Sequence, residues 1–257
     1  MEWSNKEEKS IKKLLATTTE AADLLEKMAE EMSTLMVYYR CAIMEVETKL
    51  KVLNEEFSLK HDRNPINSIK SRLKSFSSIR EKLQREGIMA TPDQIEKNLN
   101  DIAGVRVICS FLDDVYDIAE ALLKQDDIRI IRVKDYIKNP KPNGYRSLHL
   151  IIEIPIFLQH EKHMVKVEIQ LRTIAQDFWA SLEHHMRYMK NFEFTEDMGK
   201  ELLECATMSA SLDERMEKIN KTVNGYKWND KNDNLKSRNT GCRKNKRTSV
   251  SGGKNTC

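Results

Sequence analysis

The sequence lacks the long hydrophobic runs that membrane-spanning helices require. No stretch of about eighteen consecutive apolar residues occurs in the 257 residues, which argues against a transmembrane helix. The first eight residues, MEWSNKEE, are polar and acidic, and they do not resemble a secretion signal. We therefore expect no association with a membrane.

Closely spaced cysteine pairs are also absent. None of the cysteines forms a C-x-x-C pair, and their number is odd: Cys41, Cys109, Cys205, Cys242 and Cys257. Such scattered cysteines predict neither a zinc site nor a disulfide framework. A reducing cytoplasm is the location that we expect.

Excess positive charge is missing from most of the chain. The net charge is +3, but residues 231–257 contain eight Lys/Arg and one Asp, which gives +7 there and leaves −4 for residues 1–230. Charge alone therefore does not predict a nucleic-acid surface over the main body. Residues 229–257 lack apolar periodicity, and we predict a disordered basic tail. Contact of this tail with RNA stays open as an alternative.

A long amphipathic helix is predicted near the N-terminus. Apolar side chains recur at spacings of three and four from Leu25 to Phe57. A shorter helix is expected before it, with Thr17–Thr19 as the weak point. The spacing is that of a coiled coil over about five heptads, so residues 1–62 could pack on a core, mediate oligomerisation, or do both.

The middle of the chain, residues 63–192, is predicted to be a mixed sheet with helices around it. Alternating or apolar runs predict five strands at residues 68–75, 103–111, 128–137, 148–157 and 164–172. Helices are expected after a capping box at Ser78–Glu81, after Thr91-Pro92, and over residues 113–125 and 174–190. A C-terminal helix is expected within 193–228. This pattern predicts an α+β fold with long helices at both ends.

The last predicted strand has an unusual polar face. Its apolar face consists of Val165, Val167, Ile169 and Leu171, and its polar face of Lys166, Glu168, Gln170 and Arg172. A half-buried strand needs an apolar face to pack on the core, but packing does not require these particular polar residues on the other face. A carboxylate, an amide and a guanidinium in one row could bind a metal ion and phosphates.

Three further clusters could bind the same kind of ligand. They are the cationic set Lys70, Arg72, Lys74 and Lys82, the segment Asp101–Arg106, and the segment Arg132–Arg146. Two carboxylates at strand edges, Asp101 and Glu168, suit Mg²⁺ that is shared with substrate phosphates. Each signal is weak alone, because Asp101 could simply start a strand and Glu168 could belong to a surface ion pair.

Five ordered motifs together resemble one family, the RelA/SpoT-type alarmone synthetases. The motifs are Asp101–Arg106 (DIAGVR), Arg132–Asp135 (RVKD), Asn143–His149 (NGYRSLH), Val167–Thr173 (VEIQLRT) and Phe178–His184 (FWASLEH). They follow the order and approximate spacing of that family, and the match covers roughly residues 65–190. The flanking helices resemble those of the stand-alone small alarmone synthetases.

The resemblance implies a nucleotidyltransferase-like sheet and transfer of pyrophosphate from ATP to the 3′-hydroxyl of GDP or GTP, giving (p)ppGpp and AMP. It implies that Asp101 and Glu168 bind Mg²⁺ and that Glu168 accepts the proton of the 3′-hydroxyl. It assigns ATP binding to Arg72, Lys74, Lys82 and Arg106. It assigns GDP or GTP binding to Lys134, Tyr145, His149, Gln170 and Arg172, with Tyr145 stacked on guanine. Many small relatives are homo-oligomers, including tetramers, with nucleotide or RNA regulators.

Long members of the family carry an upstream hydrolase domain with a metal-binding His-Asp motif. Here His61-Asp62 is the one such dipeptide, and no histidine precedes it. We therefore expect a synthetase without hydrolase activity. Two alternatives stay open: pyrophosphate transfer to the 3′ end of tRNA, and a non-catalytic nucleotide- or RNA-binding protein of the same fold. The Tyr145 loop favours a free guanine nucleotide, and the two carboxylates favour catalysis.

Overall fold

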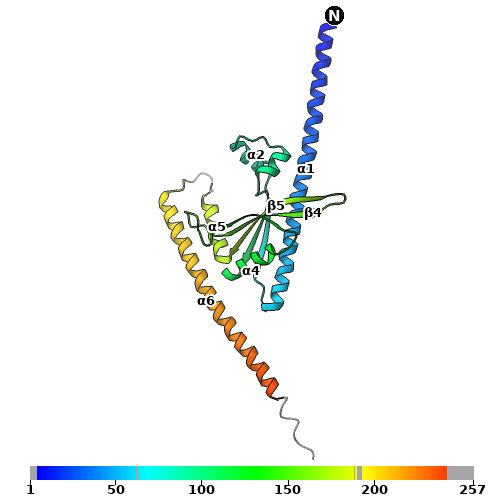
Figure 1. Ribbon diagram of the computed structural model, residues 1–257. Coiled ribbons are helices and arrows are strands. Elements are labelled where there is room, and N and C mark those ends of the chain that lie inside the picture. Colours follow the sequence, from blue (N-terminus) through cyan, green and yellow to red (C-terminus); the bar gives the residue numbers. More distant parts are fainter. Residues whose placement is uncertain (1–4, 62, 188, 190–192, 242–257) are drawn as a thin grey trace, which may run out of the picture.

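The structure is a computed structural model that describes residues 5–61, 63–187, 189 and 193–241. These residues form six helices and five strands (Figure 1). In chain order they are α1 (Asn5–His61), β1 (Ile66–Leu73), α2 (Phe76–Arg85), α3 (Pro92–Asn98), β2 (Ala103–Cys109), α4 (Leu112–Leu123), β3 (Arg129–Asp135), β4 (Leu148–Phe157), β5 (Lys162–Thr173), α5 (Ile174–Arg187) and α6 (Glu196–Gly241). The predicted α+β class is confirmed.

The five strands form one mixed sheet in the order β1-β2-β5-β4-β3. Strands β2 and β5 are parallel, and every other neighbouring pair is antiparallel. The parallel pair needs a long connection, which α4, β3 and β4 supply, whereas β4 and β5 are joined by a tight turn at Leu158–Glu161. Because β5 lies at the centre, its polar face has two strands on either side.

The apolar face of the sheet carries the main core. Val105, Val167, Ile169 and Leu150 are almost fully buried there together with side chains of α1 and α4. Helix α1 runs along this side of the sheet and continues well past it toward the N-terminus (Figure 1). Its residues from Leu35 to Leu53 supply the buried stripe, which is the packing role that the three-and-four spacing predicted.

Several boundaries differ from the sequence prediction: β1 covers residues 66–73 instead of 68–75, and α5 ends at Arg187 instead of residue 190. Helix α1 is continuous through Thr17–Thr19, because β-branched residues lower helix propensity only slightly within a long helix. Helix α2 is capped by Ser75, whose hydroxyl accepts from the Ser78 amide at 3.3 Å, so the capping box predicted at Ser78 is wrong. Helix α6 continues to Gly241, beyond the expected end at residue 228.

Other expectations agree with the structure or lie outside it. The Thr91 hydroxyl accepts from the Gln94 amide at 3.4 Å, which confirms the predicted start of α3. The second half of the expected tail, residues 242–257, and Asp62 of the His-Asp dipeptide lie outside the described residues. Within the described part of the chain, no helix has both the length and the apolar character that crossing a bilayer requires.

Candidate functional site

Polar side chains form a row across the sheet on the face opposite the core. Strand register aligns Lys70, Arg106, Gln170, His149 and Lys134, one from each of the five strands. Neighbouring strands lie about 4.8 Å apart, so the row spans the width of the sheet. Such a concentration of cations on one sheet face is favourable only where anions or solvent meet it.

The next row of the sheet contains the carboxylate of Glu168 on β5 and a glycine on β2, which has no side chain to cover the surface. Glu168 is aligned with Gly104 on β2, and Gly104 with Arg72 on β1. A Cβ on Gly104 would meet only the Arg72 carbonyl oxygen, at 3.5 Å. The missing side chain therefore leaves the surface between Arg72 and Glu168 open for a ligand.

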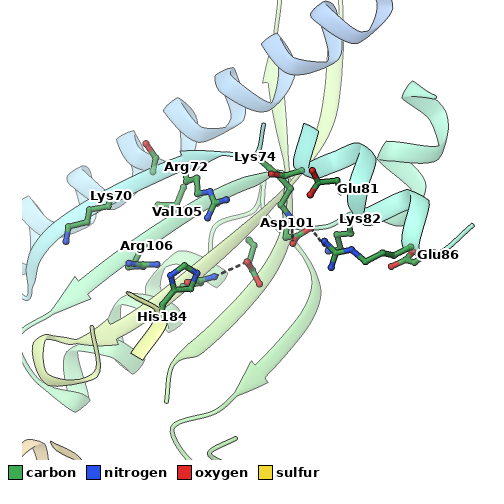
Figure 2. A pocket seen from close by; sticks show the side chains of 16 residues that line it. Lys70, Arg72, Lys74, Glu81, Lys82, Glu86, Asp101, Val105, Arg106 and His184 are labelled. Atoms are coloured by element: carbon green, nitrogen blue, oxygen red, sulfur yellow. Dashed lines mark hydrogen bonds and ion pairs between the residues drawn. The ribbon is translucent and has the colours of Figure 1, made fainter. Parts of the chain in front are cut away.

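A cavity of about 940 Å³ opens over β1, β2 and α2 (Figure 2). It is lined by cations and by both predicted metal ligands: Lys70, Arg72, Lys74, Lys82, Arg85, Arg106, Asp101 and Glu168, with Gln170 and His184 at the side of β5 and α5. The structure thus brings together every residue to which the sequence assigned ATP binding. The cations suit a polyphosphate, and the carboxylates suit a hard cation.

Asp101 lies just before β2 and is held by two lysines. Lys74 Nζ lies 2.5 Å from Oδ2, and Lys82 Nζ lies 2.8 Å from Oδ1 (Figure 2). Lys74 directly follows β1, and Lys82 lies on α2, so the turn capped by Ser75 sets their spacing. Burial alone would raise the pKa of Asp101, but the two lysines outweigh it and hold this pKa below its ordinary value.

Glu168 is held by two side chains on the same face of the sheet, one from β4 and one from β5 itself. Its Oε1 lies 3.2 Å from His149 Nδ1, and its Oε2 accepts from Gln170 Nε2 at 3.0 Å. Burial opposes ionisation, yet His149 and Gln170 together keep the pKa of Glu168 below its ordinary value. The carboxylate is therefore ionised at neutral pH, as both metal binding and proton acceptance require.

A second cavity, of about 590 Å³, adjoins the first over β4, β5 and α5. The two cavities share Arg72, Arg106, Gln170 and His184, and the second is also lined by Lys141, Asn143, Tyr145, His149, Arg172, Ala180, Ser181, Glu183 and Arg187. The structure thus brings together four of the five residues predicted to bind the guanine nucleotide. The fifth, Lys134, is exposed on the edge strand β3 next to His149 and is not among the residues lining either cavity.

Asp177 is a residue of this site that sequence reasoning missed, as are Arg85 and Arg187, which line the two cavities. Asp177 Oδ1 accepts from Arg172 at 3.1 Å and from Arg106 at 3.3 Å, and its Oδ2 lies 3.7 Å from Lys70 Nζ. It lies in the first turn of α5, which begins directly after β5. The available signal was an acidic residue in the first turn of the helix that follows Arg172. The search for candidate residues followed the alternation along the strand, which ends before Asp177.

The cations of this site are under-neutralised. Burial lowers the pKa of Arg106, and the nearby Arg172 charge lowers it further, although Asp177 opposes both. The buried Arg106 Nε has no hydrogen-bond partner. A partly exposed guanidinium with an unused buried donor, beside a second guanidinium, is an arrangement that an anion stabilises.

The comparisons with known proteins agree with this geometry. Residues 71–193 match the model of a region found in RelA / SpoT proteins. Over 201 residues the chain is 46% identical to the GTP pyrophosphokinase YwaC of Bacillus subtilis, covering 78% of this chain and 96% of that protein. The chain belongs to the small alarmone synthetases of the RelA/SpoT family.

Two solved structures of small alarmone synthetases are also similar to this chain in fold. The small alarmone synthetase 2 of Bacillus subtilis matches with a TM-score of 0.66 and 46% identity, over 73% of this chain and 96% of that one. The small alarmone synthetase 1 of the same organism, bound to its product pppGpp, matches with a TM-score of 0.66 and 35% identity, over 72% and 94%. Members of this family are GTP pyrophosphokinases that make (p)ppGpp, and this chain is one of them.

Proposed function

We propose that the chain transfers pyrophosphate from ATP to the 3′-hydroxyl of GDP or GTP, with ATP in the cavity over β1, β2 and α2 and the acceptor in the cavity over β4, β5 and α5. The observation that carries this arrangement is the place of Glu168. It lines the first cavity, and His149, which lines the second, contacts it. A carboxylate between donor and acceptor is where proton acceptance is needed.

The donor cavity would hold the triphosphate by charge. Lys74 and Lys82 point at the same carboxylate, Asp101, and would reach phosphate oxygens from there. Arg72 lies on β1 and Arg106 on the neighbouring strand β2, and both would pack against the adenine. Planar guanidiniums suit both stacking and phosphate binding.

Asp101 and Glu168 would hold Mg²⁺. The described residues contain no group of three or more His, Cys, Asp or Glu side chains arranged to bind a metal ion. A pair of carboxylates fits Mg²⁺ nevertheless, because this ion commonly uses one or two carboxylates and completes its shell with water and substrate phosphates. Bound there, it would neutralise charge on the phosphates.

The acceptor cavity would hold the guanine nucleotide beside Tyr145. The Tyr145 ring lies under two cations, with Lys141 Nζ 4.8 Å and Arg172 Cζ 5.1 Å from its centroid. Stacking on guanine would use the ring face, while His149, Gln170 and Arg172 would contact the ribose and phosphates. Lys134 would reach the acceptor phosphates from the sheet edge.

The chemistry follows from these positions. The acceptor 3′-oxygen attacks the β-phosphorus of ATP, the new oxygen–phosphorus bond forms, and the bond from the β-phosphorus to the oxygen shared with the α-phosphate breaks to release AMP. The proton of the 3′-hydroxyl goes to Glu168. Charge that builds on the phosphoryl oxygens is stabilised by Lys74 and Lys82, because positioning and electrostatics dominate phosphoryl transfer.

Anion-exchange chromatography of nucleotides tests the proposal. Wild type with ATP, Mg²⁺ and GDP or GTP should yield AMP and a more highly phosphorylated guanine nucleotide in equal amounts. Glu168→Gln and Asp101→Asn should each reduce the rate by a factor of about 10² or more. Glu161→Gln, at the exposed turn between β4 and β5, is the control for a surface carboxylate.

Other outcomes would redirect the assignment. AMP formation that requires tRNA instead of a guanine nucleotide would favour transfer to the 3′ end of tRNA. Nucleotide binding without any product from folded protein would favour a non-catalytic binding protein. Both outcomes contradict the proposed reaction. Since ATP and GTP are cytoplasmic nucleotides, the proposed location is the cytoplasm.

A homo-oligomer is part of the proposal. Helix α6 carries an exposed apolar stripe at spacings of three and four: Met208 (72% exposed), Leu212 (56%), Met216 (47%), Ile219 (57%) and Val223 (48%). A second copy of this chain would cover such a stripe. Light scattering should give the mass of an oligomer, with a tetramer as the specific expectation, and repeating it with added nucleotide or RNA tests for a regulator.

A further inference from the structure

Five side chains of the acceptor site are joined in a closed ring of hydrogen bonds. Arg172 Nη2 donates to the Tyr145 hydroxyl at 2.6 Å, and that hydroxyl lies 2.8 Å from His149 Nε2. His149 Nδ1 lies 3.2 Å from Glu168 Oε1. Gln170 Nε2 donates to Glu168 Oε2 at 3.0 Å, and Gln170 Oε1 accepts from Arg172 Nη2 at 3.0 Å. The ring thus begins and ends at one nitrogen.

Donor and acceptor chemistry fixes the direction of the bonds that Arg172 and Gln170 make, and the two bonds of His149 follow from its tautomer. A guanidinium only donates, and the two hydrogens of Arg172 Nη2 go to Tyr145 and Gln170. The Tyr145 oxygen is therefore an acceptor toward Arg172, and its own hydrogen is available for His149 Nε2. A neutral imidazole that accepts at Nε2 carries its hydrogen at Nδ1, where it faces the carboxylate. The opposite tautomer would place a lone pair against Glu168.

The ring is held rigidly at Arg172. This side chain is 4% exposed, its Nη1 donates to Asp177 at 3.1 Å, and its Nε donates to the Ser147 hydroxyl at 3.4 Å. All of its nitrogens are therefore used, and its position is over-determined. Tyr145, in contrast, lies on the loop between β3 and β4, so its hydroxyl links a loop to a fixed strand residue.

We propose that Tyr145 is a positioning residue for the reaction through its hydroxyl, which keeps His149 in the Nδ1–H tautomer and so orients the Glu168 carboxylate. This role is separate from contact between its ring and guanine. It rests on the proposed function of Glu168 as proton acceptor. The loop that receives the acceptor base thereby also sets the geometry of the group that takes the acceptor proton.

Substitution Tyr145→Phe separates the two roles because it keeps the ring and removes the hydroxyl. We expect kcat to fall about 10-fold or more, the scale of lost second-layer support, with KM for the acceptor and for ATP within about 2-fold of wild type. Tyr145→Leu, which loses the ring as well, should raise KM for the acceptor in addition. A Phe variant with wild-type kcat, or one that changes only KM, overturns the proposal.

A double-substitution cycle tests whether Tyr145 acts through His149. If the hydroxyl works through the imidazole, adding Tyr145→Phe to His149→Gln should lower kcat less than about 2-fold beyond His149→Gln alone. Full multiplication of the two losses overturns the proposal. Thermal unfolding of each variant separates these effects from loss of fold.

A spectroscopic measurement keeps the inference testable apart from the reaction. In protein labelled with ¹⁵N-histidine, the His149 resonances, assigned by their loss in His149→Gln, should report the Nδ1–H tautomer in wild type and a mixture in Tyr145→Phe. An Nε2–H tautomer in wild type contradicts the hydrogen-bond ring. If wild type makes no alarmone, the proposed function fails, and this measurement still decides whether Tyr145 sets the tautomer.

Discussion

Gly144 and Ala206 are in contact with no space for another carbon between them. A Cβ on Gly144 would lie 2.5 Å from the Ala206 Cβ and 3.1 Å from a Leu203 methyl group. Gly144 also has a φ of +88°, a region that L residues rarely adopt. The loop that carries Tyr145 is thus pressed against α6, a helix that begins beyond the residues matched by the family model.

Substituting Gly144→Ala should impair the acceptor site specifically. We expect KM for GDP or GTP to rise about 10-fold, since displacing the loop by an ångström is enough to misplace a binding group, while KM for ATP stays unchanged. Steady-state kinetics with each substrate varied in turn measures both values. Gly87→Ala is the matched control, because Gly87 has a φ of +71° but no atom within 4 Å of its added Cβ.

The two glycine variants also distinguish two causes of lost unfolding free energy: backbone strain at positive φ, and steric overlap of the added Cβ with α6. Both should lose about 1–2 kcal/mol of unfolding free energy from the positive φ. Gly144→Ala should lose more, because the loop or α6 must shift as well. Equal losses in urea unfolding would show that α6 yields freely and does not hold the loop.

Removing one lysine from the donor cavity should weaken ATP binding alone. Lys82→Met is expected to raise KM for ATP about 10- to 100-fold, the cost of one lost charged hydrogen bond to a phosphate, with KM for the acceptor unchanged. Lys124→Met, at the exposed end of α4, removes the same charge far from the cavity and is the control. A rise in KM for the acceptor, with KM for ATP unchanged, would contradict the assignment of Lys82 to ATP.

Folding should depend strongly on the ion pair Arg63–Asp114. Asp114 is 3% exposed, accepts from both terminal nitrogens of Arg63 at 2.6 and 2.8 Å, and also accepts from the Phe111 amide at the start of α4. Asp114→Ala would leave the guanidinium unpaired, and we expect a loss of about 3 kcal/mol in urea unfolding.

The exposed pair Lys124–Glu120 provides the contrast on the same helix. Glu120→Ala should leave the urea midpoint unchanged, since exposed pairs at this spacing contribute little. A midpoint shift for Glu120→Ala as large as that for Asp114→Ala would contradict this ranking by burial.

Stability should depend on pH through Asp213. Burial raises the pKa of this carboxyl above its ordinary 3.8, and the neighbouring Glu217 adds to the rise, although the Thr173 hydroxyl opposes it. The stabilisation from the protonated form is present below the unfolded pKa and is lost as pH rises through the raised folded pKa. Asp213→Asn keeps an oxygen for Thr173, so its stability relative to wild type should increase from about pH 4 to pH 7.

Urea unfolding at several pH values across that window checks the expectation. Glu214→Gln removes the next carboxyl along α6, which is exposed, and should show no such trend. A constant difference between Asp213→Asn and wild type at every pH would mean that Asp213 is ionised equally easily in the folded and unfolded chain.

Local pattern was enough to predict five strands in a mixed sheet, although not their order. The unbroken alternation from Val165 to Arg172 placed β5 and its polar face, and the bounds predicted for β4 agree with the structure. Local pattern was insufficient for the cap of α2. Ser78 satisfies the capping-box rule with Glu81 and Ser75 does not, yet the backbone path after β1 makes Ser75 the cap.

Side-chain pairing across elements could not be predicted from the chain. Asp177 unites Arg106 and Arg172 only because α5 turns back beside β2 after leaving β5. Lys134 was predicted from a motif, yet its strand lies at the sheet edge, where its exposure could not be foreseen. Its role therefore stays a prediction.

The strand order β1-β2-β5-β4-β3 has a consequence for how such an enzyme can diversify. Side chains assigned to ATP come from one half of the sheet and side chains assigned to the acceptor from the other, with β5 as the shared axis. A segment exchange limited to β3, β4 and the loop between them would change the acceptor and leave the ATP half intact. Of the residues assigned to the acceptor, Lys134, Tyr145 and His149 lie in one continuous stretch of sequence that recombination could replace in a single event, whereas Gln170 and Arg172 would stay with β5.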